Sequence, residues 1–111
     1  MKRFFSIAIA TSALIVSSLV RADAGWTEYA LVAELVSKSH YYELRLSTKK
    51  NPSGCKKKNW FYQDYGSPGA DKTYRAMLEG LSSERWLRVY VTGKCNINGY
   101  SEISAVSILM K

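Results

Sequence analysis

Residues 71–95 read DKTYRAMLEGLSSERWLRVYVTGKC, and this stretch decides the predicted fold. In its first part the apolar side chains fall at positions i, i+3, i+4 and i+7, on one helical stripe: Tyr74, Met77, Leu78 and Leu81. The period then changes to two, with Leu87, Val89 and Val91 alternating with Trp86, Arg88 and Tyr90. The stretch therefore predicts a helix that ends near Ser83 and a strand with one apolar face. Gly80 inside the helix indicates either close packing or an early end.

The strand continues into Cys95, whose only possible partner within the chain is Cys55. Two cysteines in an exported chain favour one disulfide over a metal site or a reactive thiol. In the unfolded chain this bond would close a loop of about 40 residues, which stabilises the fold by roughly 4 kcal/mol.

Export is predicted from residues 1–24, which have the features of a signal peptide. Lys2 and Arg3 are followed by an apolar segment, 7–20, and by Ala22-Asp23-Ala24, a small-x-small cleavage pattern. Cleavage is expected after Ala24, with Ala22 as the alternative. A membrane anchor is disfavoured because the apolar segment is short for a span. The sequence thus predicts a secreted or periplasmic protein, with residues 25–111 as a single domain that has no membrane span.

Outside the opening stretch, the pattern predicts four more strands. In residues 27–37 the side chains alternate between two faces and include valines, which favours a strand, although a helix is also compatible with this segment. Residues 40–47 are expected to form a strand with Tyr42, Leu44 and Leu46 pointing inward. Residues 59–65 are rich in aromatic residues and are expected to form the next strand. The helix cap is either Ser67, with Pro68 next, or Asp71. The last strand spans 100–110, and its inward set is either Ile103, Ala105 and Leu109 or Val106, Ile108 and Met110.

The resulting order is strand, strand, strand, helix, strand, strand. This order is that of the OB-fold, a five-stranded Greek-key β-barrel closed at one end by its helix. The fold class is therefore mainly β with one α-helix and one disulfide. An open antiparallel sheet with the helix packed on one face is the alternative.

The charge balance is basic but modest. Residues 25–111 keep 13 of the 16 Lys and Arg and eight of the nine Asp and Glu, which gives a formal charge of +5. Much of the excess lies in a basic loop around Cys55: Lys49, Lys50, Lys56, Lys57 and Lys58. Such a loop is typical of a solvated turn, and the alternative is attraction to anionic glycan or lipid surfaces.

The sequence offers few groups for catalysis. His40 is the only histidine, and both cysteines are expected to be paired, so neither a metal site nor a cofactor site is predicted. The chain has no Gly-rich phosphate loop and no nucleophile elbow. We therefore expect a protein that is not an enzyme.

Aromatic side chains are unusually frequent, because 12 of the 14 lie in residues 25–111. Several fall on the outward alternation of their predicted strands. Such rings stack on sugars or bases, or anchor protein interfaces. The candidate binding residues are Tyr41, Trp60, Tyr62, Trp86, Arg88 and Tyr90.

The helix-to-strand block, Gly93-Lys94-Cys95 and the closing Ile103…Val106-Ser107-Ile108 resemble the B subunits of AB5 toxins, in particular the subtilase-cytotoxin type. The resemblance covers residues 25–111 in element order and is specific in sequence over roughly residues 74–108. It implies an OB barrel, a homo-oligomer that is a ring pentamer, and binding to a cell-surface glycan or glycoprotein. No pocket motif of the family is visible in the sequence.

The predicted function is that of a secreted, non-catalytic binding module for glycans, similar to a toxin B subunit. One alternative is a periplasmic inhibitor that binds a protein. Another is a single-stranded nucleic-acid-binding OB domain, which export disfavours because intracellular nucleic acid is out of reach.

Overall fold

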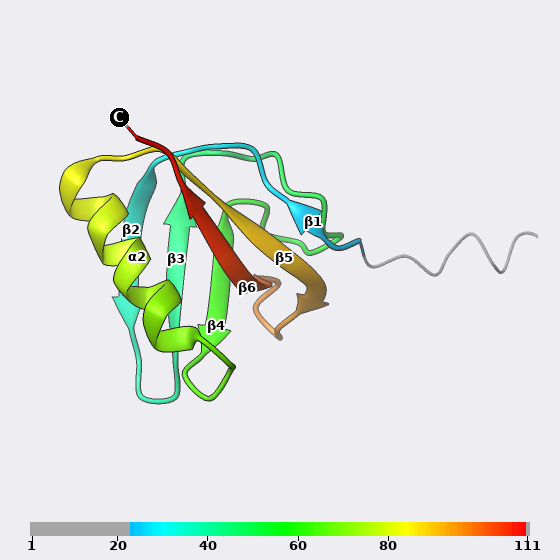
Figure 1. Cartoon of the computed structure of the whole chain (residues 1–111). Helices are drawn as coiled ribbons and strands as arrows, with labels where there is room; N and C mark the ends of the chain where they lie inside the picture. The colour runs from blue at the N-terminus through cyan, green and yellow to red at the C-terminus, as the bar shows by residue number, and fades with distance from the viewer. Residues whose placement is uncertain (1–22, 111) are drawn as a thin grey trace, which may run out of the picture.

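A computed structural model describes residues 23–110, which form six strands and one helix (Figure 1). The predicted signal peptide lies outside these residues except for Asp23 and Ala24. Along the chain the elements are β1 (Gly25–Trp26), β2 (Val32–Ser37), β3 (Tyr41–Leu46), β4 (Trp60–Asp64), α2 (Ala70–Ser83), β5 (Leu87–Cys95) and β6 (Ser101–Ile108). The predicted order is confirmed, with one additional short strand, β1, at the start.

The strands form a single open sheet in the order β1-β5-β6-β4-β3-β2. All neighbours are antiparallel except β4 and β6, which are parallel. The predicted closed five-stranded barrel is therefore wrong. The alternative prediction, an open antiparallel sheet, is correct in that the sheet is open. It is wrong in that β4 and β6 are parallel. The sheet stays open because β2 and β5 form no strand ladder. Ala30, which precedes β2, makes only an isolated bridge to Leu87.

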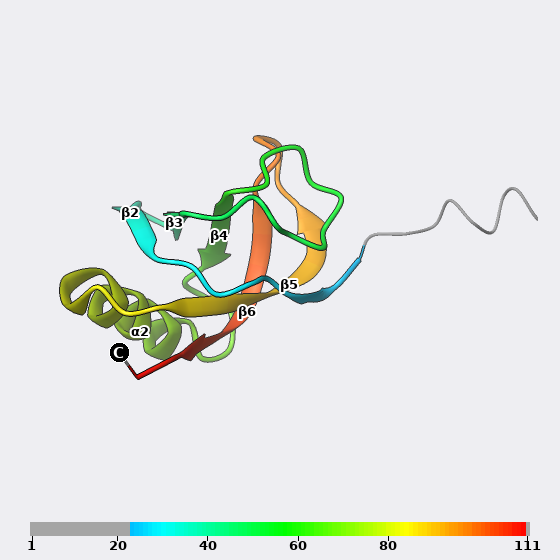
Figure 2. The same ribbon diagram turned by 90° about the horizontal axis from the view of Figure 1, so that it is seen from above.

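The sheet is strongly curved around its core. Seen from above, β5 runs along one side of the molecule and β2, β3 and β4 along the other (Figure 2). The predicted inward residues of β3 and β5 are all buried: Tyr42, Leu44, Leu46, Leu87, Val89 and Val91. They pack with Phe61 of β4, Ile103 of β6 and Met77 of the helix. The alternation of these strands thus predicted their core faces correctly.

The last strand combines both predicted registers because it contains a β-bulge. Val91 pairs with Ile103, whereas the preceding Tyr90 pairs with Ala105, so one residue of β6 is skipped. Ile103 is buried before the bulge, and after it Val106 and Ile108 pack against the core. Of the residues in the two predicted inward sets, Leu109 and Met110 are exposed.

Helix α2 lies against β2 and β6, in a rotation that differs from the predicted one (Figure 1). Its buried residues are Ala70, Thr73, Met77 and Gly80, while Tyr74 is half-buried. Leu78 and Leu81 are 44% and 37% exposed, so their predicted burial is wrong.

The reason for this rotation is close packing at Gly80. A Cβ atom on this residue would lie 2.5 Å from Cδ2 of Leu87, so only glycine lets the helix come this close to β5. Of the two alternatives predicted for Gly80, close packing is confirmed and an early helix end is wrong, because the helix continues to Ser83. The predicted caps are wrong, because Gly69 is the N-cap and no side chain caps the helix. Thr73 instead donates its hydroxyl hydrogen to the carbonyl oxygen of Gly69.

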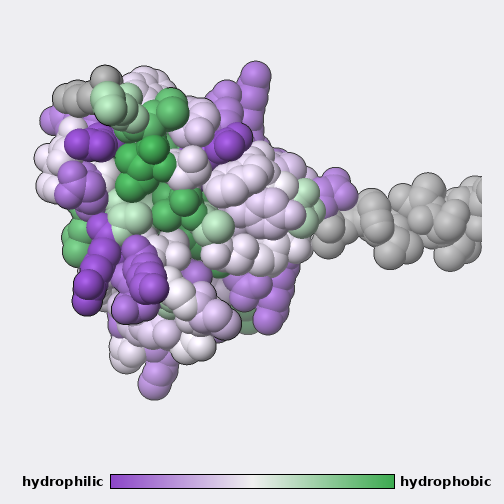
Figure 3. Space-filling view, in the orientation of Figure 1, coloured by the Kyte–Doolittle hydropathy of each residue, from purple (hydrophilic) through white to green (hydrophobic). Residues whose placement is uncertain are grey.

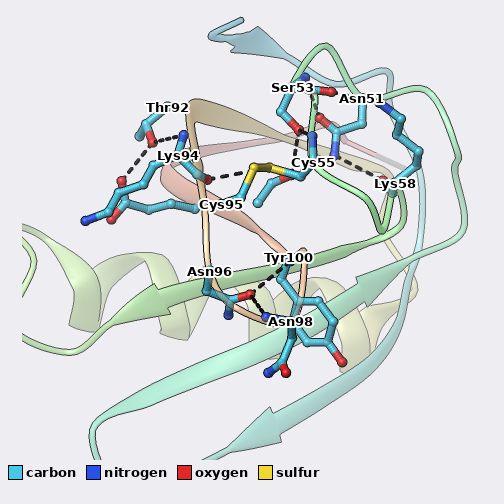
Figure 4. Close-up of a disulfide and its surroundings, with 12 residues drawn as sticks. Asn51, Ser53, Cys55, Lys58, Thr92, Lys94, Cys95, Asn96, Asn98 and Tyr100 are labelled. Atoms are coloured by element: carbon cyan, nitrogen blue, oxygen red, sulfur yellow. Dashed lines mark hydrogen bonds between the residues drawn. A yellow bond between two sulfur atoms is a disulfide. The ribbon is translucent and has the colours of Figure 1, made fainter. Parts of the chain in front are cut away.

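The predicted disulfide between Cys55 and Cys95 is present (Figure 4). It ties the basic loop to the end of β5, directly before the turn formed by residues 96–99. The backbone N–H of Lys57 also donates to the carbonyl oxygen of Gly99 over 2.9 Å. The loop and the turn are thus held together at two neighbouring points.

Candidate functional site

The outward faces of β3 and β4 place polar and aromatic side chains next to one another. The alternation that buries Tyr42, Leu44 and Phe61 turns the residues between them outward. In the antiparallel register, Tyr41 pairs with Asp64, Glu43 with Tyr62, and Arg45 with Trp60. Three of the six candidate binding residues, Tyr41, Trp60 and Tyr62, thus share one face of the sheet.

A hollow of about 210 Å³ lies at one end of this face. Two tyrosines form part of its wall, with the rings of Tyr41 and Tyr62 edge to face at a centroid distance of 6.5 Å. The β5–β6 turn supplies Ile97, which is 99% exposed. The complete lining is Tyr41, Tyr62, Asp64, Asn96, Ile97 and Asn98.

The turn that borders the hollow has a fixed backbone. The side-chain oxygen of Asn96 accepts hydrogen bonds from the backbone N–H groups of Asn98 and Tyr100, each over 3.0 Å (Figure 4). Gly99 has a φ of 83° and lies so close to Lys56 that an added Cβ would come within 2.8 Å of its Cβ. The backbone of this turn is therefore held by its own hydrogen bonds and by close packing against Lys56.

Charges of both signs lie around the hollow, because Asp64 lines it and Nζ of Lys38 lies 5.7 Å from the centre of the Tyr41 ring. Burial raises the pKa of Tyr62 to about 12, and the carboxylates of Glu102 and Asp64 contribute to the shift. The phenol of Tyr62 is protonated at neutral pH, as any tyrosine is, and can donate a hydrogen bond. Asp64, which lines the hollow, is exposed and can accept hydrogen bonds. The wall of the hollow thus offers both donors and acceptors of hydrogen bonds.

A second aromatic pair extends the face beside the hollow. The rings of Trp60 and Tyr100 stack with a centroid distance of 5.2 Å and an interplanar angle of 15°. The guanidinium of Arg45 lies 5.8 Å from the centre of the Trp60 ring and pairs with Glu34 at 3.3 Å. The ring of Trp60 thus packs against Tyr100 and Arg45 and does not line the hollow.

The other three candidate binding residues lie elsewhere: Trp86 directly precedes β5, and Arg88 and Tyr90 lie on the outward face of that strand. Trp86 is 48% exposed, but Arg88 and Tyr90 are partly covered by Trp26 of β1 and by Tyr29. The structure thus divides the six predicted residues between two surfaces. All five lysines of the basic loop are exposed, and Lys58 donates from Nζ to the carbonyl oxygen of Ser53.

Four residues of the hollow were not among the predicted binding residues: Asp64, Asn96, Ile97 and Asn98. The sequence marks 96–99 only as a turn, and nothing in it shows which strands this turn lies beside. An isoleucine within an Asn-Ile-Asn-Gly turn was the available signal, because turns favour polar residues.

In residues 23–110 no three His, Cys, Asp or Glu side chains are grouped so that they could hold a metal ion. No helix in the same range is long and apolar enough to cross a membrane.

Comparisons with known proteins add no assignment. No protein-family model, no curated protein and no solved structure matches this chain.

Proposed function

We propose that this protein is a secreted, non-catalytic binding module that holds a neutral sugar ring in the hollow between β3, β4 and the β5–β6 turn. The observation that carries the proposal is the lining of the hollow, where two tyrosine rings meet a carboxylate and the turn's asparagines. Aromatic rings offer apolar surface to the C–H face of a sugar, and the polar groups bind its hydroxyls.

The size of the hollow supports a small ligand or one residue of a larger glycan. About 210 Å³ is less than the roughly 300–1,000 Å³ of pockets that enclose drug-sized molecules. The exposed side chain of Ile97 at the border can cover the apolar side of a bound ring. A terminal sugar on a cell-surface glycan would be small enough for the hollow and would offer an apolar side to Ile97.

The strand connections support an OB-like relationship despite the open sheet. A three-strand meander, β2-β3-β4, is followed by the helix and by the β5-β6 pair, with β6 parallel to β4. OB-folds bind oligosaccharides and oligonucleotides on the face of their second and third strands, with the loop between the last two strands taking part. The hollow occupies the corresponding position. Assembly into a toxin-like ring pentamer stays an expectation that rests on the resemblance alone.

A glycan array with the purified protein tests the proposal. Removing the ring in Tyr41→Ala, or the amide in Asn98→Ala, should weaken the strongest array signal by about tenfold, because both side chains line the hollow. Trp86→Ala, an exposed aromatic on the other surface, is the matched control and should bind like the unaltered protein.

The proposal fails if no neutral glycan is retained. It also fails if the two hollow variants bind as well as the control while remaining folded by circular dichroism. An array of single-stranded oligonucleotides run in parallel tests the nucleic-acid alternative.

A further inference from the structure

Arg88 has an unusual environment on the outward face of β5. Its guanidinium carbon lies 4.6 Å from the centre of the Trp26 ring and 4.9 Å from that of the Tyr29 ring. Tyr29 is itself held by a 3.3 Å contact between its hydroxyl and that of Ser107. Two aromatic rings that precede β2 thus fix the position of one cation.

This cation has no anionic partner among residues 23–110. The ion pairs in that range are Lys38–Glu43 and Arg45–Glu34. Glu28 lies between the two ring residues in sequence, but its carboxylate accepts a hydrogen bond from Thr48. The Nε atom of Arg88 is buried and lacks any hydrogen-bond acceptor in the described residues. An acceptor from outside cannot reach this buried atom, but it can pair with the charge at the Nη groups of Arg88, which are not among the buried unpaired atoms.

The surroundings of Arg88 are apolar and partly open. Trp86 precedes it by two residues on the same face and is 48% exposed, and Leu109, whose N–H bonds to the Trp86 carbonyl, is 42% exposed. The residues of β6 paired with Arg88 and Tyr90 are the small Ser107 and Ala105. Figure 3 shows an apolar stripe over β6 beside α2, next to a paler region over β5 and β1.

We propose that this face of β1, β5 and β6 binds an acidic, extended segment of another protein. A carboxylate of the segment would accept hydrogen bonds from Arg88, and apolar side chains two residues before and after it would cover Trp86 and Tyr90. The spacing follows from the strand, in which residues i and i+2 point to the same side about 6.6 Å apart. Aromatic and arginine side chains of this kind dominate the binding energy of many interfaces.

The charge argues against a second copy of the chain as the occupant. A two-fold symmetric contact centred on this row would bring the two Arg88 side chains together, because each copy presents the same surface. Like charges in a desolvated contact oppose association. This inference is independent of the proposed sugar site, since none of its residues lines the hollow.

A peptide titration tests the inference on the full secreted chain. The probe is the blocked peptide Ac-LSESL-NH2, which places leucine, glutamate and leucine on one side of an extended backbone. Its control is Ac-LSQSL-NH2, which has the same shape but no charge. The readouts are tryptophan fluorescence and the NMR signal of the arginine Nε–H groups.

We expect the glutamate peptide to bind about tenfold more tightly than the glutamine peptide, because only the carboxylate satisfies Arg88. Arg88→Gln and Trp86→Ala should each remove most of this binding. Arg45→Gln, an arginine on β3 that already has a carboxylate partner, should leave it unchanged. Trp86→Ala keeps the test valid if Arg88→Gln fails to fold, because Trp86 is the more exposed of the two.

Equal affinity for the two peptides, or no binding at about 1 mM peptide, overturns the inference. A dimer in sedimentation velocity that Trp86→Ala abolishes also overturns it, because the face would then belong to a second copy.

Discussion

The side chain of Tyr62 is almost fully buried and also lines the surface hollow. It is only 6% exposed, yet its edge lines the hollow between Tyr41 and Asp64. Burial raises its pKa to about 12, with contributions from Glu102 and Asp64. Its hydroxyl thus remains a hydrogen-bond donor at pH values where an exposed tyrosine has begun to ionise.

This shift has a defined effect on stability. The unfolded chain releases the proton of Tyr62 near pH 10, whereas the folded protein keeps it until about pH 12. The stabilisation is therefore fully present below pH 10 and is lost as the pH rises toward 12.

An ultraviolet absorbance titration of the phenolates measures the shift directly. The protein should show tyrosines that ionise late, and Tyr62→Phe should lack one phenolate that the unaltered protein gains near pH 12. Complete ionisation of all eight tyrosines near pH 10, with the fold intact by circular dichroism, would contradict this expectation.

At the scale of elements, the spacing of apolar residues predicted where helix α2 lies in the sequence but not which of its sides is buried. The 3.6-residue period correctly indicated a helix and its end, but it indicated the wrong one of two possible buried stripes. Close packing at Gly80 decides between them, because it brings α2 within van der Waals distance of Leu87. Apolar spacing gives no weight to a glycine, so it favoured the stripe with the larger leucines.

The helix rotation is tested by comparing two neighbouring residues. Met77 is fully buried, so Met77→Ala should lower the free energy of unfolding by roughly 2–5 kcal/mol. Leu78 is 44% exposed, so Leu78→Ala should change it by about 0.5 kcal/mol. Chemical denaturation gives both values, and a larger loss for Leu78→Ala would show that the predicted stripe was right after all.

The disulfide links stability to the shape of the hollow. Cys95 directly precedes Asn96, and the loop of Cys55 contacts Gly99. The double variant Cys55→Ser/Cys95→Ser should lose about 4 kcal/mol of stability, from the 40-residue loop that the bond closes in the unfolded chain.

Sugar binding by the same variant should weaken under conditions where it is still folded, because the turn loses one of its two attachments. Denaturation curves and array signals measured on one preparation separate the two effects. Unchanged sugar binding by the folded double variant would mean that the turn keeps its shape without the bond.

At the scale of the whole molecule, the element order was predictable but the closure of the sheet was not. Strand alternation depends on each residue's immediate neighbours, and it gave the core faces of β3 and β5. Closure depends on whether residues 27–31 pair with β5 as a full strand. They form only the bridge at Ala30 and one backbone hydrogen bond, from the N–H of Thr27 to the carbonyl oxygen of Val89. Nothing in the alternation of that segment distinguishes one bridge from a ladder.

In the candidate site too, the sequence predicted the features that depend on neighbouring residues but not those that depend on long-range strand pairing. Tyr41 and Tyr62 were predictable because they lie on outward positions of strands. Asn96, Ile97 and Asn98 were not, because their place beside β4 depends on the parallel pairing of β4 with β6. The partial covering of Arg88 by Trp26 and Tyr29 likewise depends on the path of the chain before β2.

The central claim is that the hollow binds a neutral sugar ring, and an NMR titration tests it most directly. Backbone amide signals of the ¹⁵N-labelled protein would be followed while a panel of neutral methyl glycosides is added. For at least one glycoside, we predict saturable shifts at Tyr41, Tyr62 and Asn96–Asn98, which are absent in Tyr41→Ala. The absence of shifts with every glycoside, or shifts confined to β1 and β5, would contradict the proposed site.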